Sequence, residues 1–245
     1  MRWVGPLESA ALLTVLRVPA RAAASTRGVL PWAPLVGLVL GGLAAGAATA
    51  GAHLVSSLTG AVLGVAVLAA LTRGLHLDGL ADTADGLGPL RGRQRALQVM
   101  RQGDVGPFGV VTLLLTVLLQ VAAAAALLDA DRGWTAIVAA PLVARLAMAR
   151  TGLTGVPMAE GSALGRSVAG TVSARWLAGW VFVTAALLTV ADQALAAGAA
   201  AGLVAAELVM RRARARLGGV TGDVMGAMGE TAATVTLLVA AAAVG

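Results

Sequence analysis

The sequence predicts an all-α integral membrane protein that crosses the bilayer several times. Of its 245 residues, 58% are hydrophobic and 12% are charged, against about 25% charged residues in soluble domains. The mean hydropathy is +0.87. Apolar stretches close to the ~20 residues that a helix needs to span a bilayer recur along the chain. We therefore expect a single transmembrane domain over residues 1–245.

Apolar stretches give the expected helices in chain order. The first stretch, residues 6–16, is too short and too close to charged residues to span a bilayer, so we predict an interfacial or re-entrant helix there. The longer stretches predict about seven transmembrane helices, at residues 33–51, 54–72, 107–128, 134–150, 176–191, 194–210 and 228–245.

The arginines predict how these helices are oriented. The connecting loops are short, so an excess of arginine marks the cytoplasmic side. With the N-terminus in the cytoplasm, the arginine clusters near the N-terminus and after the second, fourth and sixth predicted spans all fall on that side. The other side receives Asp129, Asp131, Asp192 and one arginine, Arg132. We predict a multi-pass protein of the cell (inner, cytoplasmic) membrane whose N-terminus faces the cytoplasm.

Composition also limits the partners that we expect. The formal net charge is +6, but basic loops beside apolar spans follow from the positive-inside rule. Aromatic residues make up 3% of the chain, too few for a surface that stacks bases. We therefore expect the lipid bilayer as a partner and no nucleic acid. Self-association into a homo-oligomer stays open.

One acidic stretch, R-G-L-H-L-D-G-L-A-D-T-A-D-G at residues 73–86, is the first candidate site. Asp78, Asp82 and Asp85 are spaced i, i+4 and i+7, so in a helix their carboxylates share one face. Like charges at this spacing repel each other, which favours a bound cation. Carboxylates suit Mg²⁺, which is commonly shared with substrate phosphates. The stretch thus predicts metal-assisted phosphoryl transfer; the alternative is an acidic, solvated helix end.

Two further polar residues accompany this stretch. His76 is predicted either to accept a proton from an attacking hydroxyl or to hydrogen-bond a phosphate, and the alternative is a satisfied polar residue without a catalytic role. Asp223 lies in the glycine-rich stretch T-G-D-V-M-G-A, where backbone N–H groups can approach phosphate oxygens. Its alternative is a turn in which Asp223 caps the last helix and Gly226 is a packing residue. We expect the two stretches to converge on one membrane face.

Taken together, the motifs resemble those of the adenosylcobinamide-GDP ribazoletransferase (cobalamin synthase) family. The resemblance rests on G-L-H-L-D-G-L-A-D-T-A-D-G at 74–86, M-R-x-x-x-x-G-x-x-G at 100–109, G-G-x-T-G-D-x-x-G-A at 218–227 and Arg17-x-Pro19. It implies a membrane transferase with Mg²⁺ as cofactor. In the reaction that the resemblance implies, a hydroxyl of α-ribazole, or of its 5′-phosphate, attacks the cobinamide-linked phosphorus of adenosylcobinamide-GDP, and GMP leaves.

The expected metal ligands are Asp78, Asp82, Asp85 and Asp223. The expected catalytic residues are His76, Asp82 and Asp85, with His76 or one of the aspartates accepting the hydroxyl proton. The predicted site lies on the cytoplasmic side of the membrane.

The expected substrate-binding residues are Arg17, Arg101, Thr221 and Gly222. The chain also departs from the family's pattern. The family usually has a glycine at Arg73, a threonine at Leu16, and an aspartate followed by Ser-Arg at residues 102–104.

Two rival functions belong to other classes. Asp82-x-x-Asp85-Gly86 is the opening of the CDP-alcohol phosphotransferase signature of lipid synthesis, but the remainder of that signature is absent. A transporter or non-catalytic corrinoid-binding protein would place acids or broken helices at mid-bilayer depth. The sequence instead predicts that nearly all charge lies at the cytoplasmic ends of the spans.

Overall fold

The computed structural model describes residues 4–20 and 24–244, and within these ranges the protein is helical, with two isolated β-bridges and no strand. The predicted all-α fold is confirmed. Gly245, the last residue of the final predicted span, lies outside the described residues. The helices are α1 (Val4–Leu13), α3 (Val29–Leu54), α4 (Ser57–Thr72), α5 (Leu75–Leu87), α6 (Arg93–Val99), α7 (Pro107–Asp129), α8 (Gly133–Ala149), α9 (Ala163–Val168), α10 (Ala174–Ala191), α11 (Gln193–Leu217) and α12 (Gly222–Ala241), with a 3₁₀ turn η1 (Arg150–Gly152) after α8.

Several helices are long and apolar enough to cross a membrane, as the sequence predicts. Among the described residues there are five, α3, α7, α10, α11 and α12, or six if α4 and α5 together form one broken span. The predicted count of seven is not confirmed. Residues 134–150 do form a helix, but α8 has 17 residues, fewer than the ~20 that a straight span needs.

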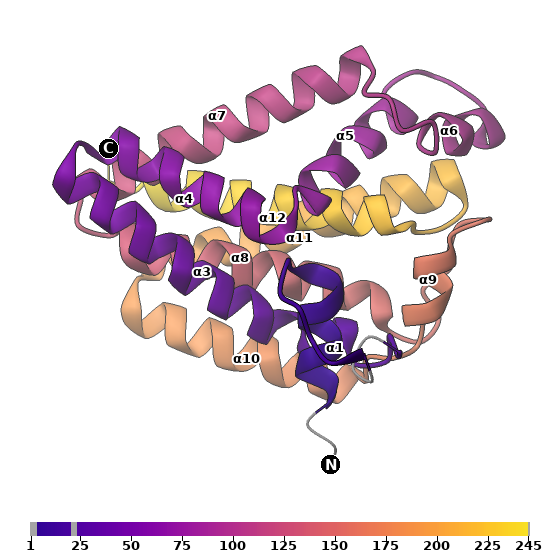
Figure 1. Ribbon diagram of the computed structural model, residues 1–245, viewed down its shortest axis with the longest axis horizontal. Coiled ribbons are helices and arrows are strands. Elements are labelled where there is room, and N and C mark those ends of the chain that lie inside the picture. The colour runs from indigo at the N-terminus through magenta and orange to yellow at the C-terminus, as the bar shows by residue number, and fades with distance from the viewer. Residues whose placement is uncertain (1–3, 21–23, 245) are drawn as a thin grey trace.

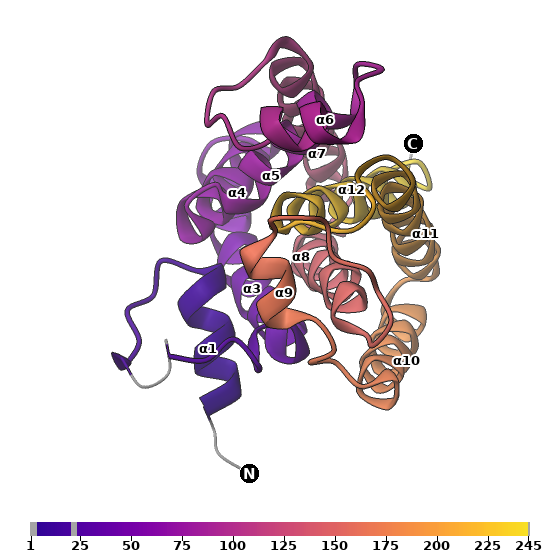
Figure 2. The ribbon, with the colours of Figure 1, turned by 90° about the vertical axis from the view of Figure 1, so that its right-hand side faces the viewer.

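Helix α8 lies at the centre of the bundle, in contact with α3, α7, α10, α11 and α12 (Figures 1 and 2). Nearly all of its residues are buried, which is the pattern of a helix enclosed on every side. Helix α3 approaches it closely because Gly37 and Gly41 face the backbone carbonyls of Pro141 and Val138. Two small residues four positions apart allow helices in a membrane to pack backbone to backbone.

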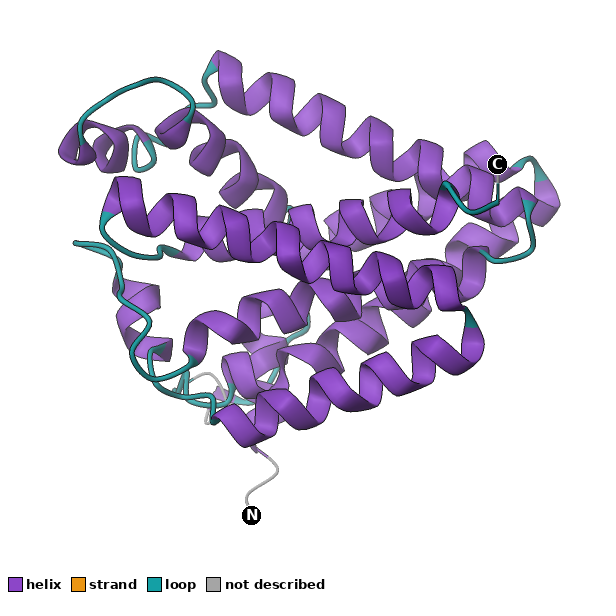
Figure 3. Ribbon diagram, turned by 180° about the vertical axis from the view of Figure 1, so that it is seen from behind, coloured by secondary structure: helices purple, strands orange, loops and turns teal. Residues whose placement is uncertain are grey.

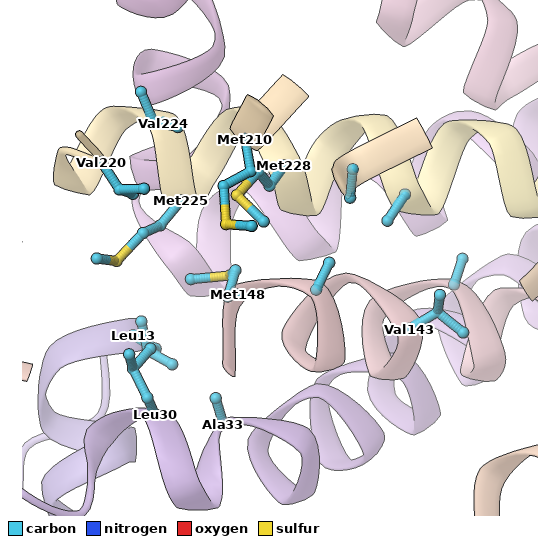
Figure 4. Packing of buried hydrophobic residues seen from close by; sticks show 14 of the residues in the cluster. Leu13, Leu30, Ala33, Val143, Met148, Met210, Val220, Val224, Met225 and Met228 are labelled. Atoms are coloured by element: carbon cyan, nitrogen blue, oxygen red, sulfur yellow. The ribbon is translucent and has the colours of Figure 1, made fainter. Parts of the chain in front are cut away.

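Methionines fill much of the core on the other side of α8. Figure 4 shows Met148 of α8 close to Met210 of α11 and Met228 of α12. All three are at most 4% exposed. The flexible thioether fits irregular gaps between crossing helices, and this packing fixes the position of α12, which carries the second predicted site segment.

The chain bends sharply where the acidic stretch begins. Helices α4 and α5 meet at 89°, and the bend is made by Arg73 and Gly74, whose φ angles are +56° and +65°. Left-handed backbone is open to glycine but unfavourable for other L-residues. Because of this bend α5 does not continue the apolar span of α4, and we treat α5 as lying outside the membrane-spanning helices.

Polar loops and short helices gather at one end of the bundle. Figure 2 looks onto this end, where α5, α6, α9 and the loop between α11 and α12 lie. In Figure 3 the long loops are at this end, whereas the turns at the opposite end are short. We call it the motif end, because residues 74–86, 100–109 and 218–227 all lie there.

Candidate functional site

The acidic and glycine-rich stretches meet where α5 crosses the start of α12. A Cβ atom added to Gly79 would lie 2.8 Å from the Cα and the carbonyl oxygen of Asp223, and one added to Gly226 would lie 3.0 Å from the carbonyl oxygen of His76. Only glycine permits backbones to approach this closely. The structure therefore brings the two stretches together, as the sequence predicts.

Carboxylates gather at this crossing, and among the described residues none of them forms an ion pair. Burial, followed by the charges of Asp78, Asp223, Asp85 and Asp104, raises the pKa of Asp82 to about 7. Asp78 is exposed, whereas Asp82 and Asp223 are half-buried. A carboxyl whose pKa is raised by neighbouring carboxylates marks a site where a cation or a proton would be bound favourably.

Asp85 has different partners. Its Oδ2 accepts a hydrogen bond from the N–H of Gly106 at 2.8 Å, and its Oδ1 accepts one from Gly109 at 3.0 Å. The side chain is 5% exposed. Gly106 is the N-cap of α7, so Asp85 supplies the negative group that helix N-termini favour. The carboxylate thus joins α5 to α7, and its expected roles in metal binding and catalysis stay predictions.

Thr221 caps α12. Its Oγ1 accepts a hydrogen bond from the N–H of Val224 and donates one to Oδ2 of Asp223, both at 3.2 Å. The alternative in which Asp223 itself caps the helix is not what the structure shows. Instead the cap orients Asp223, whose carboxylate stays at the crossing with α5.

A cavity of about 250 Å³ opens beside Asp223. Its lining includes Arg101, Thr221 and Gly222, three of the four residues expected to bind substrate. The Nη2 of Arg101 donates a hydrogen bond to the carbonyl oxygen of Glu160 at 2.7 Å, which holds the guanidinium at the cavity. The fourth, Arg17, is exposed in the loop after α1 and does not line this cavity.

Two backbone hydrogen bonds join the loop before α12 to the loop before α9 at the motif end. The N–H of Val220 donates to the carbonyl of Pro157, and the N–H of Ala159 donates to the carbonyl of Val220, both at 3.0 Å. The loop before α12 is thereby fixed against the loop before α9. Gly219 allows this pairing, because a Cβ there would overlap the backbone of Met158 and Ala159.

His76 faces the interior of the bundle. It is 2% exposed, and its Nδ1 lies 3.4 Å from Nη2 of Arg145 in α8. Burial, and then the positive charge of Arg145, hold the pKa of His76 well below its ordinary value. The imidazole is therefore neutral near pH 7.

Arg145 and Glu230 were not anticipated by the sequence analysis. Arg145 is 4% exposed, about one turn inside the end of α8, and Glu230 lies about two turns inside α12. This pair is an exception to the expectation that nearly all charge lies at the ends of the spans. The signal was available, because a charged residue within an apolar helix is costly and commonly functional.

The carboxylates at the crossing fit a magnesium ion that is shared with a ligand better than one held by protein alone. In residues 4–20 and 24–244, no three histidine, aspartate or glutamate side chains are already arranged around an ion position. The donor set is nonetheless all carboxylate, and its members repel one another at Asp82. Mg²⁺ typically takes one or two carboxylates, several waters and substrate phosphate oxygens.

The chain is similar in sequence to known proteins over most of its length. The adenosylcobinamide-GDP ribazoletransferase of Frankia casuarinae is 42% identical to this chain, over 67% of this chain and 64% of that protein. The one from a Roseiflexus species is 35% identical, over 96% of this chain and 90% of that protein. The one from a Nocardioides species is 42% identical, over 67% of this chain and 65% of that protein. No solved structure shows a significant match. A family model described as cobalamin-5-phosphate synthase matches residues 6–241, and the chain belongs to that family.

Proposed function

We propose that this protein joins adenosylcobinamide-GDP to α-ribazole, or to α-ribazole 5′-phosphate, as a late step of cobalamin biosynthesis. A ribazole hydroxyl oxygen forms a bond to the cobinamide-linked phosphorus, the bond from that phosphorus to the bridging oxygen of the diphosphate breaks, and GMP leaves. The products are adenosylcobalamin, or its 5′-phosphate, and GMP. The names of the relatives support this reaction. The observation that carries it is the meeting of the acidic stretch with the T-G-D loop at Gly79 and Asp223.

The carboxylates at the crossing are proposed to hold Mg²⁺ together with the diphosphate of the substrate. Asp78, Asp82 and Asp223 are the protein ligands in this proposal, and the ion would neutralise charge on the diphosphate. The proton of the attacking hydroxyl passes to a carboxylate of the same cluster. Asp82 is proposed for this role because it lies among the other carboxylates of the cluster.

The cavity beside Asp223 is proposed to receive the phosphates. Arg101 supplies a positive charge there, and Thr221 and Gly222 place the N-terminus of the 20-residue helix α12 against the cavity. Unpaired N–H groups and the helix dipole favour anions at such an end. Arg17, in the loop after α1, is proposed to contact substrate from outside this cavity.

The motif end is proposed to face the cytoplasm of a cell membrane. Arg91, Arg93 and Arg95 lie in or next to α6 at this end, and the arginines of the α11 C-terminus lie there as well. At the opposite end Arg132 forms an ion pair with Asp192, which neutralises its charge. This distribution supports the positive-inside orientation.

The test is release of GMP by the purified protein in liposomes, given adenosylcobinamide-GDP with α-ribazole or its 5′-phosphate. We expect GMP and a cobalamin product in equal amounts with Mg²⁺, and neither with EDTA. Activity undiminished by EDTA would remove the metal part of the proposal. If folded protein forms no GMP, CDP-diacylglycerol with an alcohol acceptor tests the phospholipid rival. Corrinoid binding without GMP release would favour the non-catalytic one.

A further inference from the structure

A polar cluster lies inside the bundle, beside the site and separate from its carboxylates. His76 of α5, Arg145 of α8, Gln120 of α7 and Glu230 of α12 line one cavity with apolar neighbours. Gln120 donates from Nε2 to Oε2 of Glu230 at 2.9 Å and to Oγ1 of Thr234 at 3.0 Å. Four helices thus contribute polar groups to one point in the interior.

The cluster is incompletely paired. Nε2 of His76 and Nε of Arg145 are buried without a hydrogen-bond partner. Among the described residues, no oxygen of Glu230 lies within 4.0 Å of an Arg145 nitrogen. A buried guanidinium without a close counter-charge is strongly unfavourable, so a further polar group between the two residues is expected.

The size of the cavity identifies that group. Its volume is about 60 Å³, and a buried water needs roughly 10–15 Å³ of such space and two to four polar partners. The cavity therefore has space for a few water molecules. Water accepting from Arg145 and donating to Glu230 would complete an indirect ion pair.

Contact with Arg145 also decides which ring nitrogen of His76 carries the proton. A guanidinium can only donate hydrogen bonds, so Nδ1 of His76, 3.4 Å from Nη2, must accept. The neutral ring then carries its proton on Nε2. His76 also lines a second cavity, of about 80 Å³, together with Asp223, so this residue borders both the interior cluster and the site.

We propose that Arg145 and Glu230 are positioning residues, linked through water in the bundle interior, that fix His76 as the Nε2–H tautomer. His76 is then a hydrogen-bond donor at the site and not the base that accepts the hydroxyl proton. Arg145 and Glu230 act on the reaction through His76 and do not touch the substrate. The catalytic part of this inference rests on the proposed function; the tautomer and the paired charges do not.

The tautomer can be observed directly because the chain has two histidines. The other one, His53, is exposed near the end of α3, so a His53→Gln protein labelled with ¹⁵N-histidine reports on His76 alone. We expect ¹⁵N chemical shifts of a neutral ring protonated at Nε2. Adding Arg145→Met should remove this preference. A ring protonated at Nδ1 in the Arg145 protein would overturn the proposal, whatever reaction the protein catalyses.

Two sets of variants separate positioning from folding. Arg145→Met or Glu230→Gln alone leaves one buried charge and should lower the melting temperature in detergent, whereas the double variant should restore most of it. Turnover of the double variant should stay at least ~10-fold below that of the parent, because the reacting group loses a hydrogen bond. The KM for adenosylcobinamide-GDP should change little. Recovery of turnover together with stability would show that the pair is only structural.

Replacing His76 tests the direction of the hydrogen bond. The side-chain amide of His76→Gln donates from near the position of Nε2, whereas that of His76→Asn lies near Nδ1. We expect more turnover in His76→Gln than in His76→Asn. Equal or reversed activities would contradict the donor role. If the parent protein releases no GMP, the proposed function fails, while the ¹⁵N spectra and melting temperatures still decide the water-linked pair.

Discussion

Asp82 and Asp85 are three residues apart in α5, yet their surroundings are opposite. Asp82 faces other carboxylates, which together with burial raise its pKa to about 7. Asp85 has each of its oxygens bonded to a backbone N–H at the start of α7. The negative charge of Asp82 is repelled by its neighbours, whereas the carboxylate of Asp85 is stabilised by two backbone hydrogen bonds.

This difference separates a binding role from a structural one within a single motif. Spacing along a helix places side chains on one face, but the neighbouring elements decide whether a charge is compensated. An uncompensated carboxylate is suited to a cation, whereas a compensated one stabilises the arrangement of helices. Substitutions at the two positions should therefore fail in different ways.

Asp82→Asn should have the largest effect on activity. The substitution removes a charge needed for Mg²⁺ and the proposed proton acceptor, so we expect turnover to fall by on the order of 10²- to 10⁴-fold. The melting temperature in detergent should be unchanged or higher, because one of several mutually repelling charges is lost. GMP release and thermal unfolding measure the two effects. Near-parental turnover would exclude Asp82 from the reaction.

Asp85→Asn should act mainly on stability. The amide oxygen can still accept one N–H, but the amide nitrogen then faces a second donor. Losing a charged hydrogen bond of this kind costs about 1.5–3 kcal/mol, and we expect a lower melting temperature in detergent. Asp78→Asn is the matched control, since Asp78 is exposed and its replacement should leave unfolding unchanged. Parental stability in Asp85→Asn would contradict the capping role.

The meeting of the two site segments could be predicted from sequence, and the role of Asp85 could not. Gly79, Asp223 and Gly226 belong to motifs whose composition already indicates close backbone approach. The partners of Asp85 are the N–H groups of Gly106 and Gly109, which no side-chain pattern reveals. Hydrogen bonds to backbone depend on where the next helix begins in space, and that depends on the whole fold.

The interior cluster was missed for another reason. Counting arginines in loops predicts orientation, but it gives no weight to a charge inside a span. Arg145 and Glu230 lie in the predicted spans 134–150 and 228–245 and meet His76 only after three helices pack together. Helix α8 also shows why the predicted span count is not confirmed, since a buried central helix can be apolar all round without the length of a span.

The bend between α4 and α5 allows the smallest effect to be tested. Arg73 has φ +56°, and left-handed backbone costs a residue with a side chain about 1–2 kcal/mol. The weak, exposed bond from Nη2 of Arg73 to the carbonyl of Leu12, at 3.4 Å, offsets little of that cost. Replacing Arg73 with glycine would remove this cost, but glycine has more conformational freedom in the unfolded chain. That freedom lowers the stability gained by about 0.4–1 kcal/mol.

Arg73→Gly should therefore raise stability by about 1 kcal/mol or less, with turnover unchanged because Arg73 lies outside the site. Arg73→Ala is the matched control: it removes the same side-chain bond but keeps a Cβ in left-handed backbone, so it should not be stabilised. Thermal unfolding of both variants in one detergent makes the comparison. If alanine stabilised the protein as much as glycine, the arginine side chain and not the backbone would be the source of the strain.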